Sequence, residues 1–157
     1  MEAPTIVLRP ISSLVRYAKN ARTHSPEQVR EIAASIREFG WVGSVLADDD
    51  GLVAGHGRLM ALELLVSQGE EVRFPNGAVL PPGQVPVVAC DGWSPKQRKA
   101  YIIADNKLAL NAGWDNALLK GELSDLKLEG FDLSLVGFRL WEAYTGRKAE
   151  LETKEAT

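Results

Sequence analysis

The feature that most constrains the fold is a strand, a glycine-rich turn and an apolar helix that follow one another between Leu52 and Val66. Leu52–Ala54 predicts the strand, and the turn is Gly55–Arg58. Glu63 is the only polar residue in the octet 59–66, so a helix there has no face suited to water. Other parts of the chain must surround this helix, which predicts a globular domain with a real core.

A second helix is indicated directly upstream. Ser25-Pro26-Glu27-Gln28 combines an N-cap serine, a proline in the first turn and a glutamine at the capping-box position. Apolar residues then recur at the spacing of one helical face, and Gly40 supplies a left-handed stop. The pattern predicts a helix from Pro26 to Phe39.

Two further helices are expected downstream. Ser94–Gln97 repeats the start signal and predicts a helix that ends near Asp105. Another helix is expected from about Asp115 to Lys127. We expect Ala117, Leu118 and Leu126 to face inward there.

The remaining apolar segments predict strands. Residues 5–8, 44–47, 52–54 and 85–90 are short and apolar, and the turn at 48–51 joins two of them into a hairpin. Residues 72–84 are rich in turn signals and predict a small surface hairpin. The three aspartates at 48–50 fit turn geometry better than a metal loop.

Length and composition limit the class of protein. The chain has 157 residues, which suits one domain, and we expect residues 1–138 to form it, with 139–157 as a partly disordered extension. A single cysteine, Cys90, excludes an internal disulfide and a cysteine-built zinc site. No apolar run approaches the ~18 residues of a membrane span. We therefore expect a cytoplasmic protein with no membrane partner.

Charge is distributed unevenly. The net charge is −3, from 18 basic and 21 acidic side chains, so the overall composition does not indicate a nucleic-acid-binding protein. One segment without acidic residues nevertheless carries four basic ones: Arg9, Arg16, Lys19 and Arg22. A solvated surface segment and a contact with DNA phosphates are both open interpretations.

The turn at 55–58 is the first candidate site. A helix N-terminus exposes unpaired N–H groups and the positive end of the helix dipole, which favours anions. Gly55 and Gly57 leave room for close approach by a phosphate, and the guanidinium of Arg58 suits phosphate oxygens. His56 adds a hydrogen bond or acid–base chemistry near neutral pH. The alternative interpretation is that the two glycines serve only the backbone geometry of a turn between a strand and a helix.

Asp105 and Asn106 are the second candidate. A carboxylate and an amide side by side offer the oxygen ligands that phosphate-bound Mg²⁺ prefers. The structural alternative is a helix C-terminal cap in which Asn106 takes a left-handed conformation.

Together these segments resemble a known family. Asn20-Ala21-Arg22, the helix at 26–39, the hairpin and Gly55–Ala61 follow the order of the ParB/sulfiredoxin-like domain. The segments 101–107 and 111–115 are similar to a branch found in phages and prophages, often fused to DNA methyltransferases. The resemblance spans about Ile6 to Phe138. It implies an α+β (mixed α/β) fold, a small mixed sheet with flanking helices.

The resemblance also implies a function. The Gly-X-X-Arg corner would cradle nucleotide phosphates, with CTP or ATP bound together with Mg²⁺. The implied cofactor-binding residues are Gly55, His56, Gly57, Arg58, Asp105 and Asn106; Asp105 and Asn106 would hold the metal, and His56 and Arg58 would serve catalysis. We expect a nucleotide-binding module for phage, prophage or plasmid DNA transactions, with slow Mg²⁺-dependent triphosphate hydrolysis as its candidate activity. DNA, a DNA methyltransferase or another phage DNA-processing protein, and a second copy of the chain are the expected partners.

Two other functions stay open. Many ParB-like domains are described as nucleases, although here only Asp105, Asp48–Asp50 and Asp115 offer carboxylates for metal. A non-catalytic accessory module that binds DNA or protein is the third hypothesis. The sequence also departs from the family pattern, because His56-Gly57 replaces the usual Glu-Arg. Sulfiredoxins place their catalytic cysteine where His56 stands, so sulfinic-acid reduction is not expected.

Overall fold

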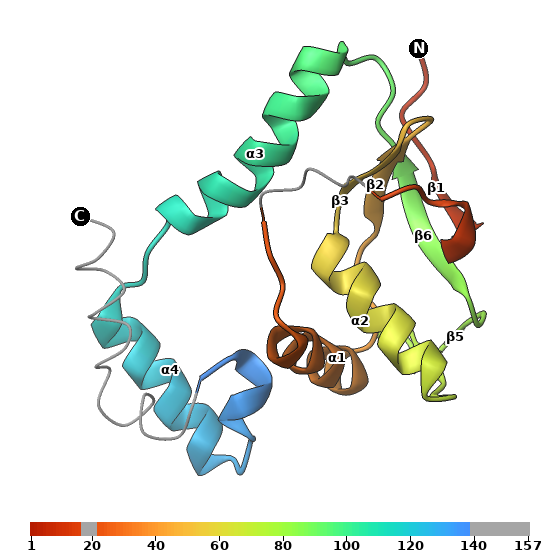
Figure 1. Cartoon of the computed structure of the whole chain (residues 1–157). Coiled ribbons are helices and arrows are strands. Elements are labelled where there is room, and N and C mark those ends of the chain that lie inside the picture. Colours follow the sequence, from red (N-terminus) through yellow and green to blue (C-terminus); the bar gives the residue numbers. More distant parts are fainter. Residues whose placement is uncertain (17–21, 139–157) are drawn as a thin grey trace. The chain divides into compact units, whose positions relative to one another are not determined.

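The computed structural model describes residues 1–16 and 22–138 (Figure 1). The chain forms two compact units, Met1–Asn106 and Lys107–Thr157, and the boundary falls inside one helix. Lys19 and the expected extension at 139–157 lie outside the described residues.

A four-stranded mixed sheet forms the centre of the first unit (Figure 1). Its strands follow the order β1 (Ile6–Pro10), β6 (Gln84–Ala89), β2 (Val45–Asp48) and β3 (Gly51–Ala54). The outer pairs β1–β6 and β2–β3 are antiparallel, whereas the central pair β2–β6 is parallel. The predicted α+β class with a small mixed sheet is confirmed.

The helices of this unit flank the sheet. They are η1 (Ile11–Ser13), α1 (Pro26–Phe39), α2 (His56–Ser67) and the start of α3 (Pro95–Asn111). The short strands β4 (Val72–Arg73) and β5 (Val79–Leu80) pair with each other and form the small hairpin expected there.

Helix starts follow the side chains that cap them. Ser25 Oγ accepts from Gln28 N at 3.1 Å, as predicted for α1. At α3 the capping box is complete: Ser94 Oγ accepts from Gln97 N, and Ser94 N donates to Gln97 Oε1 at 3.0 Å.

The predicted end of α3 is wrong. The helix continues through Asp105 and Asn106 to Asn111. Residues 107–110 are Lys-Leu-Ala-Leu, which are good helix formers, and the next glycine is Gly113. Nothing at position 105 breaks the helix, so Asp105 and Asn106 lie within it.

α2 lies in the core, as its composition demands. Leu59, Leu62 and Leu65 are each at most 1% exposed, and α2 packs against α1 (Figure 1). Trp41 is 1% exposed and its Nε1 donates to Gly43 O at 3.0 Å. Burial of such side chains contributes roughly 1.5–3 kcal/mol each and is the main force that holds the unit together.

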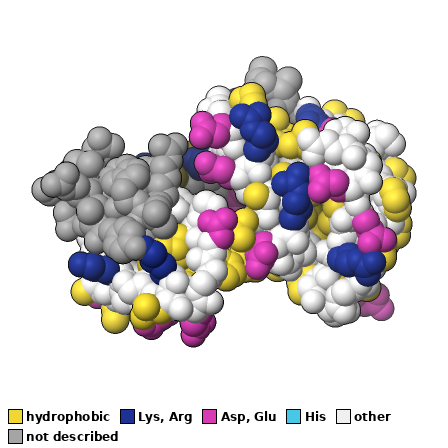
Figure 2. Space-filling model, turned by 90° about the horizontal axis from the view of Figure 1, so that it is seen from below, with side chains coloured by type: hydrophobic (Ala, Val, Ile, Leu, Met, Phe, Trp, Pro, Cys, Tyr) yellow, Lys and Arg dark blue, Asp and Glu magenta, His cyan; other side chains and the backbone are white. Residues whose placement is uncertain are grey.

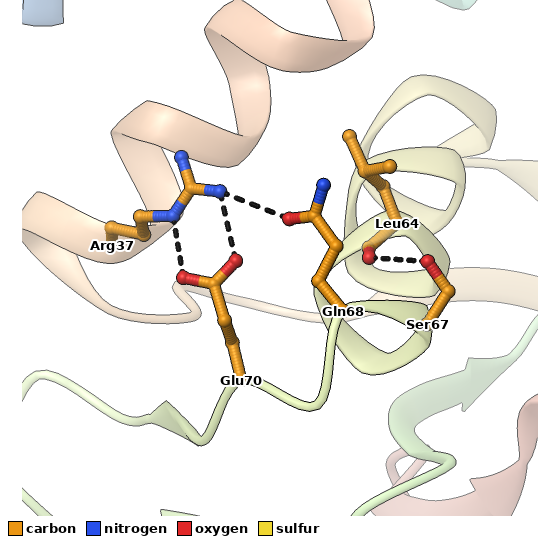
Figure 3. A network of polar contacts seen from close by, with 5 residues as sticks. All are labelled: Arg37, Leu64, Ser67, Gln68 and Glu70. Carbon is orange, nitrogen blue, oxygen red and sulfur yellow. Dashed lines mark hydrogen bonds and ion pairs between the residues drawn. The ribbon is translucent and has the colours of Figure 1, made fainter.

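Polar contacts join the far ends of α1 and α2 (Figure 3). Arg37 of α1 binds both carboxylate oxygens of Glu70 at 2.8 Å, and its Nη2 also donates to Gln68 Oε1 at 3.3 Å. Ser67 Oγ donates to Leu64 O and closes the last turn of α2. The Arg37 guanidinium holds the pKa of Glu70 below its ordinary value.

The second unit contains α4 (Asn116–Leu128) and η2 (Leu133–Val136). Its small core joins Leu123 and Leu133, with Leu119, Leu126, Val136 and Phe138 packed around them. The expectation that Ala117 and Leu118 face inward is wrong, because both are exposed. The residues of α4 that face this core are Leu119, Leu123 and Leu126, so the prediction for Leu126 is confirmed. Asp115 caps the helix by accepting from Leu118 N.

Among residues 1–16 and 22–138, no helix has both the length and the apolar character to cross a membrane.

Candidate functional site

All six residues predicted to bind a cofactor border one cavity of about 470 Å³ in the first unit. Its walls come from α1, β2, the β3–α2 corner and α3. The lining residues are His24, Ile32, Ser44, Leu46, Ala54, Gly55, His56, Gly57, Arg58, Asp105 and Asn106. The pairing of β2 with β3 shifts register between Leu46 and Ala47 at this wall, because Val53 of β3 is an extra residue that forms a β-bulge. Bulges are common beside functional sites because they redirect side chains.

The two glycines of the corner are required by packing within the protein. Gly55 has φ 97°, and a Cβ there would lie 2.6 Å from Val45 Cγ1. A Cβ on Gly57 would lie 2.9 Å from Cε1 of His24. We expected these glycines to make room for a phosphate; their packing against Val45 and His24 is a second reason for glycine at both positions.

α2 begins without a side-chain cap. Gly55 is the N-cap in the left-handed conformation, and the first turn contains no acidic residue. The first backbone bond runs from Leu59 N to Gly55 O. Helix N-termini of this kind present N–H groups and a positive dipole end to an anion.

Arg58 is anchored to the main chain. Its Nη1 donates to Val42 O and its Nη2 to Ser44 O, each at 3.0 Å, and the guanidinium lies 5.7 Å from the Trp41 ring centroid. Burial lowers the pKa of Arg58, which remains a cation. We expected an anion or a carboxylate to compensate this charge; the carboxylate of Asp105 acts in that direction, and two carbonyl oxygens and an aromatic face also stabilise the cation.

His56 is the first residue of α2. Its Nε2 is buried and finds no hydrogen-bond partner among the described residues. Burial lowers the pKa of His56, and the nearby His24, Arg16 and Arg98 lower it further, against a smaller opposite effect of Asp105. A buried nitrogen without a partner is costly unless a ligand or water satisfies it.

Asp105 and Asn106 form the opposite wall. Asn106 Nδ2 donates to Ile102 O at 2.7 Å, which leaves Oδ1 as the free end of the amide. Asp105 is exposed, and its Oδ1 lies 3.5 Å from the hydroxyl of Tyr101. The left-handed cap considered for Asn106 is excluded, because no described residue other than glycine has a positive φ.

His24 borders the same cavity. It stands directly before the N-cap Ser25, a position that is typical of a surface loop. In the structure it is half-buried, its ring packs on Gly57, and its Nδ1 lies 2.8 Å from Gln28 Oε1. The signal in the sequence is Gln28, a glutamine one helical turn after the histidine, which also occupies the capping-box position.

The basic segment is only partly free for DNA. Arg16 pairs with Glu63 of α2, and Arg9 donates to Ser13 O at 3.5 Å. Arg22 is half-buried, and Lys19 lies outside the described residues. On the face shown in Figure 2, basic and acidic side chains lie next to one another rather than in patches of one sign.

The other carboxylates considered for metal binding have structural partners. Asp48 accepts from Arg98 Nε at 2.5 Å and from Asp50 N at 2.9 Å. Asp115 caps α4. Across the part of the chain that the structure describes, no three His, Cys, Asp or Glu side chains gather in a group that could hold a metal.

Cys90 follows β6 and lies outside the cavity walls. Burial raises the pKa of its thiol, and the nearby Asp48 and Asp91 raise it further. A thiol of this kind is a poor nucleophile.

Comparison with known proteins decides the family. No protein-family model matches the chain. The ParB-like nuclease domain-containing protein YnaK of Escherichia coli strain K12 is 56% identical over 61 residues, which are 38% of this chain and 70% of that protein. The chain belongs to the ParB-like superfamily.

A solved structure of a ParB protein has the same fold. The C-terminally truncated chromosome-partitioning protein ParB from Caulobacter crescentus, complexed with CTP-γ-S, aligns with a TM-score of 0.60 at 18% identity. The alignment covers 86% of this chain and 72% of that one. A Pnob8-like ParB-N domain aligns with a TM-score of 0.48 at 18% identity, over 82% of this chain and 51% of that one.

Proposed function

We propose that this ParB-like chain binds a nucleoside triphosphate, CTP or ATP, with its phosphates at the N-terminus of α2. The observation that carries the proposal is the cavity of about 470 Å³ around the uncapped helix start, bordered by Gly55–Arg58, Asp105 and Asn106. The ParB with the same fold was crystallised with a CTP analogue. The buried Nε2 of His56 is a further group that a ligand would satisfy.

The residues present fit a magnesium ion that arrives with the nucleotide. Asp105 and the free Oδ1 of Asn106 are hard oxygen donors, and Mg²⁺ is commonly held by one or two carboxylates plus phosphates and waters. When bound, Mg²⁺ would neutralise phosphate charge beside Asp105. The backbone amides of α2 and the cation of Arg58 would orient the phosphates, and His56 would donate to a phosphate oxygen or position a water. Slow hydrolysis by positioning and charge stabilisation is part of the proposal.

The direct test is thermal unfolding with ATP, CTP and GTP, each with and without Mg²⁺. A ligand at 100 times its Kd adds about 2.7 kcal/mol to the free energy of unfolding. We expect one nucleotide to stabilise the chain in Mg²⁺, and Asp105→Ala to remove the Mg²⁺ dependence. Asp125→Ala replaces another exposed helical aspartate and serves as the control. Absence of any shift in the wild type would refute the proposal.

The cellular setting remains part of the same proposal. We infer a cytoplasmic role in phage, prophage or plasmid DNA transactions, with DNA, a DNA methyltransferase or other DNA-processing protein, or a second copy of the chain as partner. DNA affinity that falls steeply with salt, and rises when the nucleotide is present, would support this role.

The name of the Escherichia coli relative contains a nuclease domain, so nuclease activity is the second candidate function. Incubation of plasmid DNA with Mg²⁺ or Mn²⁺ distinguishes the two activities. Nicking that disappears in Asp105→Ala and persists in Asp125→Ala would favour a nuclease; stable plasmid together with nucleotide binding favours the proposal.

A further inference from the structure

His24 and Gln28 form a hydrogen-bonded pair that no part of the proposed site explains. The pair belongs to the start of α1: His24 lies just before the N-cap, and Gln28 lies one turn into the helix. With Oε1 as the acceptor, His24 Nδ1 carries the proton and donates across 2.8 Å. Nε2 is then the nitrogen of this ring that is left for another partner.

The ring is also fixed from its other side. A Cβ on Gly57 would lie 2.9 Å from Cε1 and 3.0 Å from Nδ1 of His24, and 3.2 Å from Cδ1 of Ile32. The imidazole therefore packs directly on the first turn of α2. Glycine at position 57 therefore leaves space for the ring beside the first turn of α2.

His24 shares its surroundings with the groups already assigned to the phosphate. His24, His56 and Arg58 line the same cavity, with Asp105 as the one carboxylate opposite. Nδ1 of His24 is the ring nitrogen bonded to Gln28, and Nε2 of His56 is buried without a partner among the described residues. When protonated, two imidazoles beside an uncapped helix start can each donate an N–H to one anion.

We propose that His24 is an anion-binding residue of this cavity, held by Gln28 and by contact with Gly57 so that its Nε2–H donates to a phosphate oxygen at the start of α2. This inference rests on the proposed function and adds a residue to it. In the complex His24 is an imidazolium: Nδ1–H donates to Gln28 and Nε2–H to the phosphate. A hydrogen bond from a charged donor to an anion is stronger than a neutral one.

The experiment uses the fact that the chain contains only two histidines. Imidazole NMR signals of the full chain are recorded at pH 7 while Mg²⁺–ATP, Mg²⁺–CTP and, separately, inorganic sulfate are added; His24→Gln assigns the signals. We expect the His24 signals to move to the positions of an imidazolium on addition of the bound nucleotide. Binding without any change of the His24 signals would overturn the inference and leave the proposed function intact. Absence of binding to the wild type would refute both.

Three variants test the positioning by calorimetric titration with the same nucleotide. His24→Gln is expected to weaken binding about tenfold or more, the range of a lost charge-assisted contact. Gly57→Ala keeps every ionisable group but displaces the ring, so its affinity should fall in the same direction. Gln28→Leu should give a smaller loss. The control Gly121→Ala, where nothing lies within 4 Å of the new Cβ, should bind as the wild type does. Full affinity in both His24→Gln and Gly57→Ala would overturn the inference.

Discussion

The guanidinium of Arg58 binds the main chain before any ligand arrives. Two of its N–H groups are used by Val42 and Ser44, and its face lies near Trp41. Arg58 therefore fixes the segment between α1 and β2 as well as bordering the cavity. Its remaining N–H groups are what it can offer an anion, because guanidinium carries five donors.

For this reason Arg58→Ala should lower stability even without ligand. Two carbonyl oxygens would lose a charged donor, and such bonds contribute about 1.5–3 kcal/mol. Urea unfolding of the free protein measures the loss, with Arg30→Ala, an exposed arginine of α1, as the control. An unchanged midpoint would show that the bonds to Val42 and Ser44 contribute nothing.

Gly55 is the other residue on which the corner depends. Its φ of 97° lies in the region that side chains rarely adopt, and the new Cβ of Gly55→Ala would meet Val45 at 2.6 Å. We expect a loss of about 1–3 kcal/mol, because strain and steric overlap add. Chemical unfolding measures it. Gly121→Ala, inside α4, should be neutral or slightly stabilising, since alanine favours helices.

Local signals predicted the residues of the corner but not their neighbours. The strand, the turn and the buried helix of 52–66 follow from residues that are adjacent in sequence. His24 reaches Gly57 across more than thirty residues, and Arg58 reaches backward to the carbonyls before β2. Such contacts depend on how α1 and α2 pack, which no short pattern encodes.

At the scale of elements, one ion pair ties α3 to the β2–β3 hairpin. Arg98 Nε donates to Asp48 Oδ2 at 2.5 Å, and both side chains are only 13% exposed. Arg98 Nη2 also lies 3.4 Å from Leu52 O. The contact fixes the part of α3 that precedes Asp105, so it supports the wall of the cavity that faces α2.

Asp48→Asn should therefore weaken both the fold and the site. The substitution replaces the Asp48 carboxylate by a neutral amide, so the largely buried cation of Arg98 loses this ion pair. We expect a loss of about 1–3 kcal/mol in the free energy of unfolding. Nucleotide affinity should fall with it, because Asp105 is carried on the same helix. Asp49→Asn, in the exposed part of the same turn, is the control. Equal stability of the two variants would contradict this role.

The elements were predicted better than their ends and faces. Capping residues and left-handed glycines act within a few residues, so α1, the hairpin and the start of α3 could be read directly. The end of α3 could not be predicted in this way. An Asp-Asn pair in the middle of a helix has the same local sequence as a C-terminal cap, and only the position of the next helix-breaking residue, Gly113, distinguishes the two. The inward face of α4 was predicted at Leu126 but not at Leu119 and Leu123, because its small core is formed with η2, which lies outside the helix itself.

At the scale of the whole molecule, His56 and the acidic residues Glu70 and Asp132 act in different pH ranges. Burial lowers the pKa of His56 below its ordinary 6.5, so the unfolded chain binds this proton more readily than the folded one. The free energy of unfolding should therefore fall as pH drops below about 6.5. The lowered pKa values of Glu70 and Asp132 stabilise the fold above their ordinary values and act only at more acidic pH.

The expected result is a stability profile with two separate acid steps. His56→Asn should remove the step that begins near pH 6.5 and leave the lower one, whereas Glu70→Gln should reduce only the lower one. Denaturant midpoints between about pH 2 and 8 measure both. A wild-type profile that is flat between pH 5 and 7 would contradict the assignment to His56.

The position of β6 in the sheet sets the order in which the chain can fold. β1 has β6 as its strand partner, and β2 meets its parallel neighbour only through Val87–Ala89. On the ribosome, the first eighty or so residues can build α1, the β2–β3 hairpin and α2, but the middle of the sheet does not yet exist. Closure waits for a strand translated late, and such long-range pairing is slow. A nascent chain paused before Gln84 would leave the apolar strand Ile6–Leu8 without a partner and open to chaperones.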